Sequence, residues 1–217
     1  MARPAPIPRW FAITYTAFVV VLVPFYSVGY GFANFLWFSN IALISTVLTV
    51  WLHWRLLASM QLVSIGLLEM AWTIDVVAGF FIADGSLIGL AAYMYDDEIP
   101  LHLRLLSLYH LFLPWILLWL VWRLGYDERG WKWQTVLAWS VLLVCYLVTD
   151  PQDNINWTFG LGNSPQDVMP SWLYLLLMMV AYPVAVYFPT HLVVRRVVGW
   201  LEGKLGRGDG ELRAASD

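Results

Sequence analysis

Charged residues and cysteine are both scarce in this chain. Only 12% of its 217 residues are Asp, Glu, Lys or Arg, and 60% are hydrophobic. That balance is too apolar for a soluble domain of this size. The single cysteine, Cys145, excludes an intramolecular disulfide and any thiol redox chemistry that needs a pair. We therefore expect an integral membrane protein with a buried structural thiol.

Several signatures of cofactor binding and catalysis are also missing. The sequence contains no HxxxH or HExxH pair for zinc and no G-x-S-x-G around a serine nucleophile. Lys132 lies at the very start of an apolar stretch and Lys204 lies beyond the last one, so retinal would find no Schiff-base partner within the membrane. His53 and His191 come nearest to a haem-binding pair, but an interfacial role is favoured for both. We predict no metal and no cofactor.

Six long apolar stretches dominate the sequence instead. A bilayer core of about 30 Å needs roughly 20 apolar residues per helix, and backbone groups cannot stay unpaired in lipid. We predict an all-α membrane protein, a bundle of six transmembrane helices over residues 1–205, with a polar tail over 206–217. Short interfacial helices are expected at Leu87–Tyr95, in an outer loop, and at Val193–Leu205, near the C-terminus. The six spans are approximately 10–30, 33–53, 58–82, 101–123, 131–149 and 171–193.

The basic residues fall on one side of this predicted bundle, with one exception. Eleven of the twelve Lys and Arg residues precede the first span, follow the last, or flank the second and fourth connections. The other connections contain acidic residues but no Lys or Arg. Because positive residues are retained in the cytoplasm, we predict cytoplasmic termini in a bacterial inner membrane, with the acidic loops outside. The exception is Arg104.

A few polar residues lie at membrane depth, where they are costly and usually functional. Counted from the outer boundary at about 1.5 Å per residue, Asn40 and Asp75 lie about 10 Å deep and His110 about 13 Å deep. A carboxylate or amide beside an imidazole can orient it as a base. We predict an outward-facing site with His110 as base and Asp75 or Asn40 orienting it. Glu69 lies roughly 20 Å deep and need not belong to the cluster.

Polar residues nearer the outer surface extend the predicted site. Arg104 is expected to pair with Asp75 or Asp150. The longest polar segment, residues 150–170, is long enough to indicate a functional loop. The residues predicted to bind substrate are Arg104, Glu69, Asp150, Asn154 and Asn156.

Two segments resemble a known family. FLWFSNIALISTVL (Phe35–Leu48) and YHLFLPWILLWLVW (Tyr109–Trp122) are similar to the androgen-induced and androgen-dependent TFPI-regulating family. Its six-helix members hydrolyse fatty-acid esters of hydroxy fatty acids with an intramembrane threonine and histidine, and the resemblance assigns that histidine to His110. The threonine position is occupied by Trp37, and Ser39 would point about 200° away on a helix. The LSLYHLFLP and DPQDNINW patterns also resemble bacterial six-helix membrane proteins, which assigns no activity.

The sequence is compatible with three functions. The first is hydrolysis or transfer of a lipid acyl ester, with membrane lipid as the partner. The second is a non-enzymatic binding or assembly subunit, whose polar residues lock helices together and which has a protein partner or a second copy of itself. The third is a proton-coupled transporter with Glu69 and Asp75 as relay sites. No nucleic-acid partner is expected. No local motif marks a nucleophile among the nearest hydroxyls, which are Ser39, Thr46, Ser107 and Tyr109.

Overall fold

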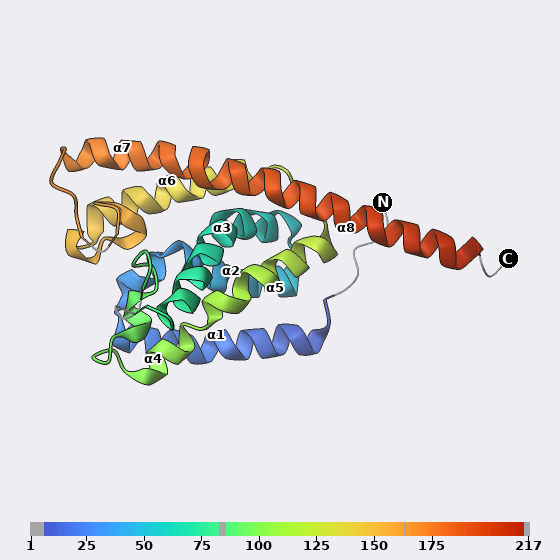
Figure 1. Ribbon diagram of the computed structural model, residues 1–217, viewed down its shortest axis with the longest axis horizontal. Helices are drawn as coiled ribbons and strands as arrows, with labels where there is room; N and C mark the ends of the chain where they lie inside the picture. Colours follow the sequence, from blue (N-terminus) through green and yellow to red (C-terminus); the bar gives the residue numbers. More distant parts are fainter. Residues whose placement is uncertain (1–6, 83–85, 163, 215–217) are drawn as a thin grey trace.

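The computed structural model describes residues 7–82, 86–162 and 164–214, and side chains up to residue 201 and at 203. All regular secondary structure within those residues is helical, which confirms the all-α prediction (Figure 1). The longer elements are α1 Arg9–Gly29, α2 Phe38–Leu52, α3 Arg55–Gly79, α4 Leu101–Leu106, α5 Tyr109–Leu124, α6 Gly130–Val148, α7 Ser171–Ala181 and α8 Phe188–Ala214. The short ones are η1 Phe32–Leu36, η2 Ala92–Tyr95, η3 Pro151–Asp153, η4 Ile155–Trp157 and the π-helical segment η5 Tyr182–Tyr187.

Most of these helices are long and apolar enough to cross a bilayer. Within the described residues, five such segments occur, formed by α1, α3, α4 with α5, α6, and α7 with η5 and the first part of α8. The helix α2 is apolar but has only 15 residues, which gives a length of about 22 Å. Many large apolar side chains on these helices are exposed, as expected where lipid rather than water surrounds the bundle.

The two ends of the bundle differ in what they contain. The start of α1 and the far end of α8 lie at the same end, together with the α2–α3 and α5–α6 connections (Figure 1). We call this the terminal end. The opposite end, which we call the loop end, contains residues 30–37, 86–100, 149–162 and 164–170.

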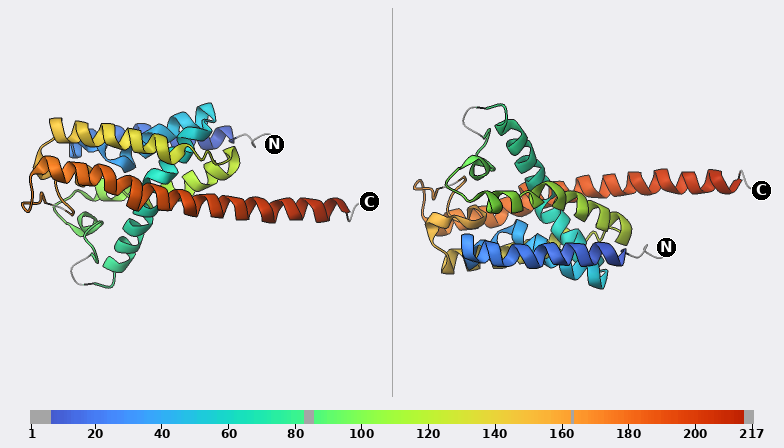
Figure 2. Two further views of the ribbon diagram at one scale, coloured as in Figure 1. Left: turned by 90° about the horizontal axis from the view of Figure 1, so that it is seen from above. Right: turned by 90° about the horizontal axis from the view of Figure 1, so that it is seen from below.

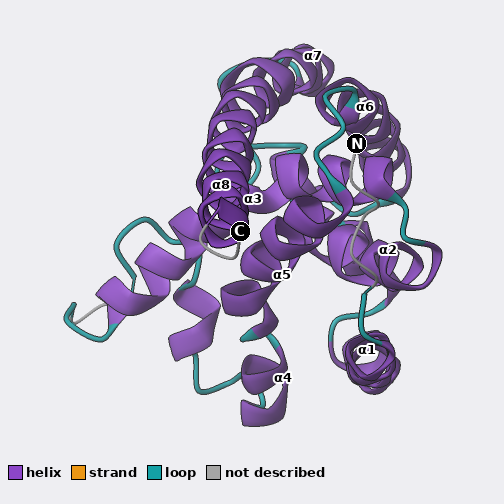
Figure 3. Cartoon of the chain, turned by 90° about the vertical axis from the view of Figure 1, so that its right-hand side faces the viewer, coloured by secondary structure: helices purple, strands orange, loops and turns teal. Residues whose placement is uncertain are grey.

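The helix α3 is the centre of the bundle and carries much of its buried polarity. It packs against α2, α5 and α6, and it is the most buried of the described spanning segments (Figure 3). Its last turns project to one side of the bundle (Figure 2). Polar side chains at membrane depth are costly against lipid, and a central helix can enclose them in protein. The buried polar residues of α3 include Ser59, Gln61, Ser64, Glu69 and Asp75.

The fourth apolar stretch is divided into α4 and α5 by a break at Ser107. The Ser107 hydroxyl donates to the Leu103 carbonyl oxygen at 3.0 Å and pairs with the Tyr26 hydroxyl at 2.6 Å. At this point the backbone bonding changes to a three-residue spacing, since the His110 N–H donates to the Ser107 carbonyl oxygen at 3.1 Å. His110 therefore lies in the first turn of a new helix, so a depth counted along one straight helix does not apply to it.

The last apolar stretch runs through α7, η5 and α8 without interruption. Pro183 lies within the π-helical segment and has no N–H, so it cannot bond the carbonyl of Met179. The indole N–H of Trp139 donates to that carbonyl oxygen at 2.7 Å and ties α6 to α7. The interfacial helix expected at Val193–Leu205 is a continuous part of α8, which extends to Ala214. The one expected at Leu87–Tyr95 is replaced by an irregular segment that ends in the short η2.

Candidate functional site

His110 is held by Glu69 inside the bundle. The imidazole Nδ1 lies 2.7 Å from a Glu69 carboxylate oxygen, with 13% and 5% of the two side chains exposed. The Trp72 and Tyr109 rings lie 4.8 and 4.1 Å from the imidazole, centroid to centroid. These rings restrict the rotation of His110, so its orientation is set by both packing and hydrogen bonding.

The bond to Glu69 also decides which ring nitrogen is available. The Glu69 carboxylate accepts a hydrogen bond from the Nδ1–H group, which leaves Nε2 as the basic nitrogen of the neutral ring. Among the described residues, Nε2 makes no hydrogen bond. A histidine oriented by a carboxylate at one nitrogen, with the other one free, is the arrangement that activates hydroxyl nucleophiles in hydrolases.

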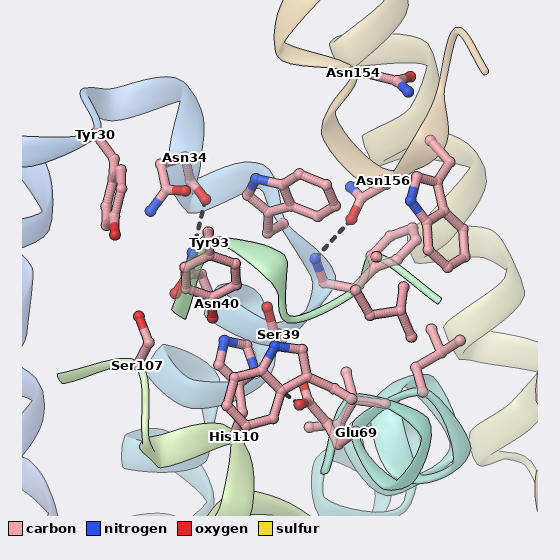
Figure 4. Close-up of a pocket in the computed structure, with 18 of the residues that line it drawn as sticks. Tyr30, Asn34, Ser39, Asn40, Glu69, Tyr93, Ser107, His110, Asn154 and Asn156 are labelled. Atoms are coloured by element: carbon pink, nitrogen blue, oxygen red, sulfur yellow. Dashed lines mark hydrogen bonds and ion pairs between the residues drawn. The ribbon is translucent and has the colours of Figure 1, made fainter. Parts of the chain in front are cut away.

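A cavity of about 420 Å³ opens beside this pair at the loop end (Figure 4). Its walls come from α1, η1, α2, α3, α5 and the two long loops, so distant parts of the sequence meet there. Most of the lining is aromatic or amide, and the described lining residues include no Lys or Arg. Of the predicted site residues, the lining includes Asn40, Glu69, His110, Asn154 and Asn156.

Asn40 lines the cavity but does not orient His110, contrary to the prediction. Its side-chain oxygen accepts a hydrogen bond from the Tyr109 hydroxyl at 2.9 Å, and its NH₂ group donates to the Asn34 carbonyl oxygen at 2.8 Å. Asn40 therefore fixes Tyr109, the ring that stacks on His110. Its contribution to the imidazole is indirect.

Asp75 makes no hydrogen bond to His110 either, and the prediction that it orients the imidazole is wrong. Its two carboxylate oxygens accept hydrogen bonds of 2.7 to 2.8 Å from the backbone N–H groups of Leu87, Ile88 and Ala91 and from the Ser86 hydroxyl. We call residues 86–91 the Asp75 strap. A buried carboxylate is costly unless it is hydrogen-bonded, and the strap satisfies this one. Ile88, Gly89 and Leu90 of the strap also form part of the cavity wall.

Arg104 and Asp150 lie outside the cavity lining and do not pair with Asp75 or with each other. The Arg104 guanidinium donates to the Met94 carbonyl oxygen and to the Asp97 carboxylate, both at 3.3 Å. The Asp150 carboxylate accepts from the Gln152 N–H at 2.9 Å and caps η3. The break after α4 separates Arg104 from α5, and nearer backbone groups already occupy the oxygens of Asp75.

Asn154 and Asn156 line the cavity and also hold its wall in place. Both have left-handed backbone conformations, with φ of 41° and 51°, which asparagine tolerates better than most residues. The Asn154 side chain bonds the backbone of Gly160 through both its oxygen and its NH₂ group. The Asn156 oxygen accepts from the Phe38 N–H at 2.9 Å, and its NH₂ group donates to the Leu36 carbonyl oxygen at 2.8 Å.

The structure adds residues to the site that were not among the predicted site residues. Ser39, named above only as one of the nearest hydroxyls, lines the same cavity as Tyr109 and His110 (Figure 4). Within the described chain, the Tyr30 hydroxyl, the Asn34 NH₂ group and the Trp72 indole N–H are buried without a hydrogen-bond partner. No local motif indicates any of these residues. For the Glu69–His110 pair a signal did exist, because a carboxylate at membrane depth requires a partner.

No metal site is formed by the part of the chain that the structure describes, since no three His, Cys, Asp or Glu side chains gather there. Comparison of the chain with known protein families, with curated proteins and with solved structures gave no match. The resemblance of Phe35–Leu48 and Tyr109–Trp122 to the TFPI-regulating family therefore stays a prediction. The case for a function depends on the geometry of the cavity.

Proposed function

We propose that the protein is an intramembrane enzyme that hydrolyses or transfers the acyl group of a lipid ester. His110 is the general base, Glu69 is the positioning carboxylate, and Ser39 is the nucleophile. The observation that carries the proposal is the Glu69–His110 pair, whose second imidazole nitrogen has no partner in the described chain and adjoins a cavity. A structural lock between helices needs no such cavity beside it.

The reaction follows the ordinary course of acyl transfer. His110 Nε2 takes the proton of the Ser39 hydroxyl while the oxygen attacks the ester carbonyl carbon. The bond between that carbon and the alcohol oxygen breaks, and the alcohol leaves with the proton from His110. Water, or a second alcohol in a transfer reaction, then attacks the acylated Ser39 and restores the free hydroxyl. Glu69 holds the imidazole in position and stabilises its charged form during both steps.

We further propose that the cavity faces the outside of a bacterial cytoplasmic membrane and that both termini are cytoplasmic. The terminal end holds Arg9, Arg55, Arg129 and Lys132, whereas the connections of the loop end contain acidic residues. Positive residues favour the cytoplasmic side, so this distribution supports a loop end on the outside. Membrane lipid from the outer leaflet is then the natural source of substrate.

The geometry supports a proton-coupled transporter less well. That function uses Glu69 and Asp75 as relay sites, but the Asp75 carboxylate accepts four hydrogen bonds from the strap. Protonation of Asp75 would disrupt some of those bonds, and the strap residues that line the cavity would lose their attachment to α3. A non-enzymatic binding or assembly role is the outcome if the purified protein binds lipid without turnover.

The decisive experiment measures hydrolysis of long-chain p-nitrophenyl esters by the purified protein in lipid nanodiscs. His110→Ala is expected to lower kcat by about 10³-fold or more, and Ser39→Ala by a similar factor. Ser39 should also be labelled by a fluorophosphonate probe, and His110→Ala should slow the labelling. His102→Ala, an exposed histidine on α4, is the matched control and should leave turnover unchanged. Equal turnover by wild type and His110→Ala, with unchanged melting temperatures, would overturn the proposal.

A further inference from the structure

A second region of the cavity contains polar groups that the chemistry at His110 does not use. The Tyr30 hydroxyl and the Asn34 NH₂ group are both buried, and neither has a partner among the described residues. In Figure 4 both project into the part of the cavity that also receives the Ser107 hydroxyl. Burying a polar group without a hydrogen bond is unfavourable. A ligand with hydrogen-bonding groups of its own would relieve that cost.

The groups around this region are hydroxyls and amides. The Tyr26 hydroxyl lies 2.6 Å from the Ser107 oxygen, and Tyr93 lies beside Ser107. We call Tyr26, Tyr30, Asn34, Tyr93 and Ser107 the hydroxyl pocket; all five line the cavity. Each of these groups is neutral. Together they can both donate to and accept from a ligand hydroxyl.

The charges around the cavity argue against an anionic headgroup. Its described lining includes no Lys or Arg, and its ionisable carboxylates are Glu69 and Asp153. Arg104 is outside the lining and is bonded to the Met94 carbonyl and to Asp97. A phosphate that entered would lose hydration without gaining a cation, which is strongly unfavourable. A headgroup that contains only hydroxyls meets no such penalty.

We propose that the hydroxyl pocket binds the alcohol part of a neutral glycerol ester, so that the substrate is a mono- or diacylglycerol and not a phospholipid. This inference rests on the proposed function, because it assumes that Ser39 and His110 act on the acyl ester next to the pocket. Tyr30 and Asn34 determine the specificity by bonding the free hydroxyl groups. Hydrolysis gives a fatty acid and the alcohol, which takes the proton from His110 as its bond to the acyl carbon breaks.

The test measures binding of a compound that cannot be hydrolysed. 1-O-hexadecylglycerol, hexadecyl phosphate and hexadecanol share one chain and differ in headgroup. Wild-type protein and His110→Ala, in nanodiscs, are both expected to bind the alkylglycerol at least about tenfold more tightly than the other two. Tyr30→Phe and Asn34→Ala should each weaken that binding by about three- to tenfold. Tyr174→Phe is the matched control, since its hydroxyl is also buried without a described partner but lies outside the cavity lining.

Each outcome decides a separate point. Equal or tighter binding of hexadecyl phosphate, or equal binding of hexadecanol, would overturn the neutral glycerol assignment. Unchanged binding by both Tyr30→Phe and Asn34→Ala would overturn the role of the hydroxyl pocket. Selective binding of the alkylglycerol without any p-nitrophenyl ester hydrolysis would retain the pocket and reject the enzyme. Hydrolysis without that selectivity would retain the enzyme and reject the pocket.

Discussion

Two histidines are held inside the bundle through Nδ1, one toward each end. His110 is bonded by a carboxylate next to a cavity at the loop end. At the terminal end, His191 is 5% exposed, and its Nδ1 pairs with the Tyr126 hydroxyl at 2.8 Å. The aromatic rings of Tyr126, Trp131 and Phe188 surround its imidazole. The difference shows that a buried, hydrogen-bonded histidine becomes a candidate base only with an orienting carboxylate and room for a substrate.

The two ends of the bundle also differ in how their polar side chains are bonded. At the terminal end, Arg55 donates to the Tyr126 carbonyl oxygen, and the Ser59 hydroxyl accepts from the Asp127 N–H at 2.9 Å. Arg129 makes two side-chain hydrogen bonds to the Asp127 carboxylate, at 3.1 and 2.9 Å. These pairs close the α5–α6 connection against the start of α3. At the loop end, the unpartnered groups of Tyr30 and Asn34 belong to side chains that line a cavity. The comparison therefore predicts activity effects at the loop end and stability effects at the terminal end.

The largest expected effect comes from Glu69→Gln. The glutamine amide can donate to Nδ1, which moves the imidazole proton to Nε2 and removes the base. We expect kcat for ester hydrolysis to fall by about 10³- to 10⁴-fold, as for the analogous change in serine hydrolases, with KM and the melting temperature nearly unchanged. Glu69→Asp should recover part of the loss. A kcat for Glu69→Gln within tenfold of wild type would show that the pair at the loop end is as structural as the one at His191.

Asp75→Ala should give the next largest effect, on stability. The change leaves the N–H groups of the strap without their acceptor, which we expect to lower the free energy of unfolding by about 3 kcal/mol. Chemical denaturation in detergent measures this value. Asp97→Ala is the control, because an exposed ion pair with Arg104 should contribute less than about 1 kcal/mol. If both variants have the same stability as wild type, the strap does not depend on Asp75.

Tyr126→Phe makes the corresponding change at the terminal end. It removes one buried hydrogen bond to His191, and we expect a loss of about 1 kcal/mol in unfolding free energy. Ester hydrolysis should stay at the wild-type rate. A drop in kcat comparable to that of Glu69→Gln would contradict the division of roles between the two histidines.

The smallest expected effect is a pH dependence of stability at the terminal end. Hydrogen bonding from Arg129 keeps the pKa of the Asp127 carboxyl below its ordinary value. Because the folded pKa is the lower one, its stabilisation is present above the unfolded pKa of about 4 and is lost as pH falls further. Arg129 is largely exposed, so we expect less than about 1 kcal/mol. Melting temperatures from pH 3 to 7 should show a shallower acid decline for Asp127→Asn than for wild type.

The helical class was predictable because lipid leaves the backbone few alternatives. Hydropathy is enough to identify apolar helices when every backbone group must be paired within its own segment. It does not determine tilt or breaks. A break at Ser107, whose hydroxyl pairs with that of Tyr26, interrupts the fourth stretch, and α3 leaves the bundle axis at its far end. Both features depend on contacts between segments far apart in the sequence.

Some of the residues that line the cavity were among the predicted site residues. His110 lines the cavity, and Asn40, Asn154 and Asn156 line it too. Depth counting assumed straight helices perpendicular to the membrane, so it grouped Asp75 with His110 and set Glu69 apart. Residues such as Tyr30 and Asn34 could not be predicted from a sequence pattern. Whether a polar group lacks a hydrogen-bond partner depends on the folded structure.

The π-helical segment η5 has a consequence for how the chain tolerates insertion and deletion. On an α-helix, residues five apart are about 140° out of phase. In η5 the wider turn brings Tyr182 and Tyr187 to one face, where their rings stack with centroids 5.8 Å apart. Tyr182 bonds the Asn156 carbonyl oxygen at the loop end, while Tyr187 is buried further along the helix. A π-helical turn holds about one residue more than an α-helical turn. Loss of a single residue here would let the segment return to α-helix with α8 in nearly the same orientation relative to α7, but Tyr182 and Tyr187 would no longer share one face.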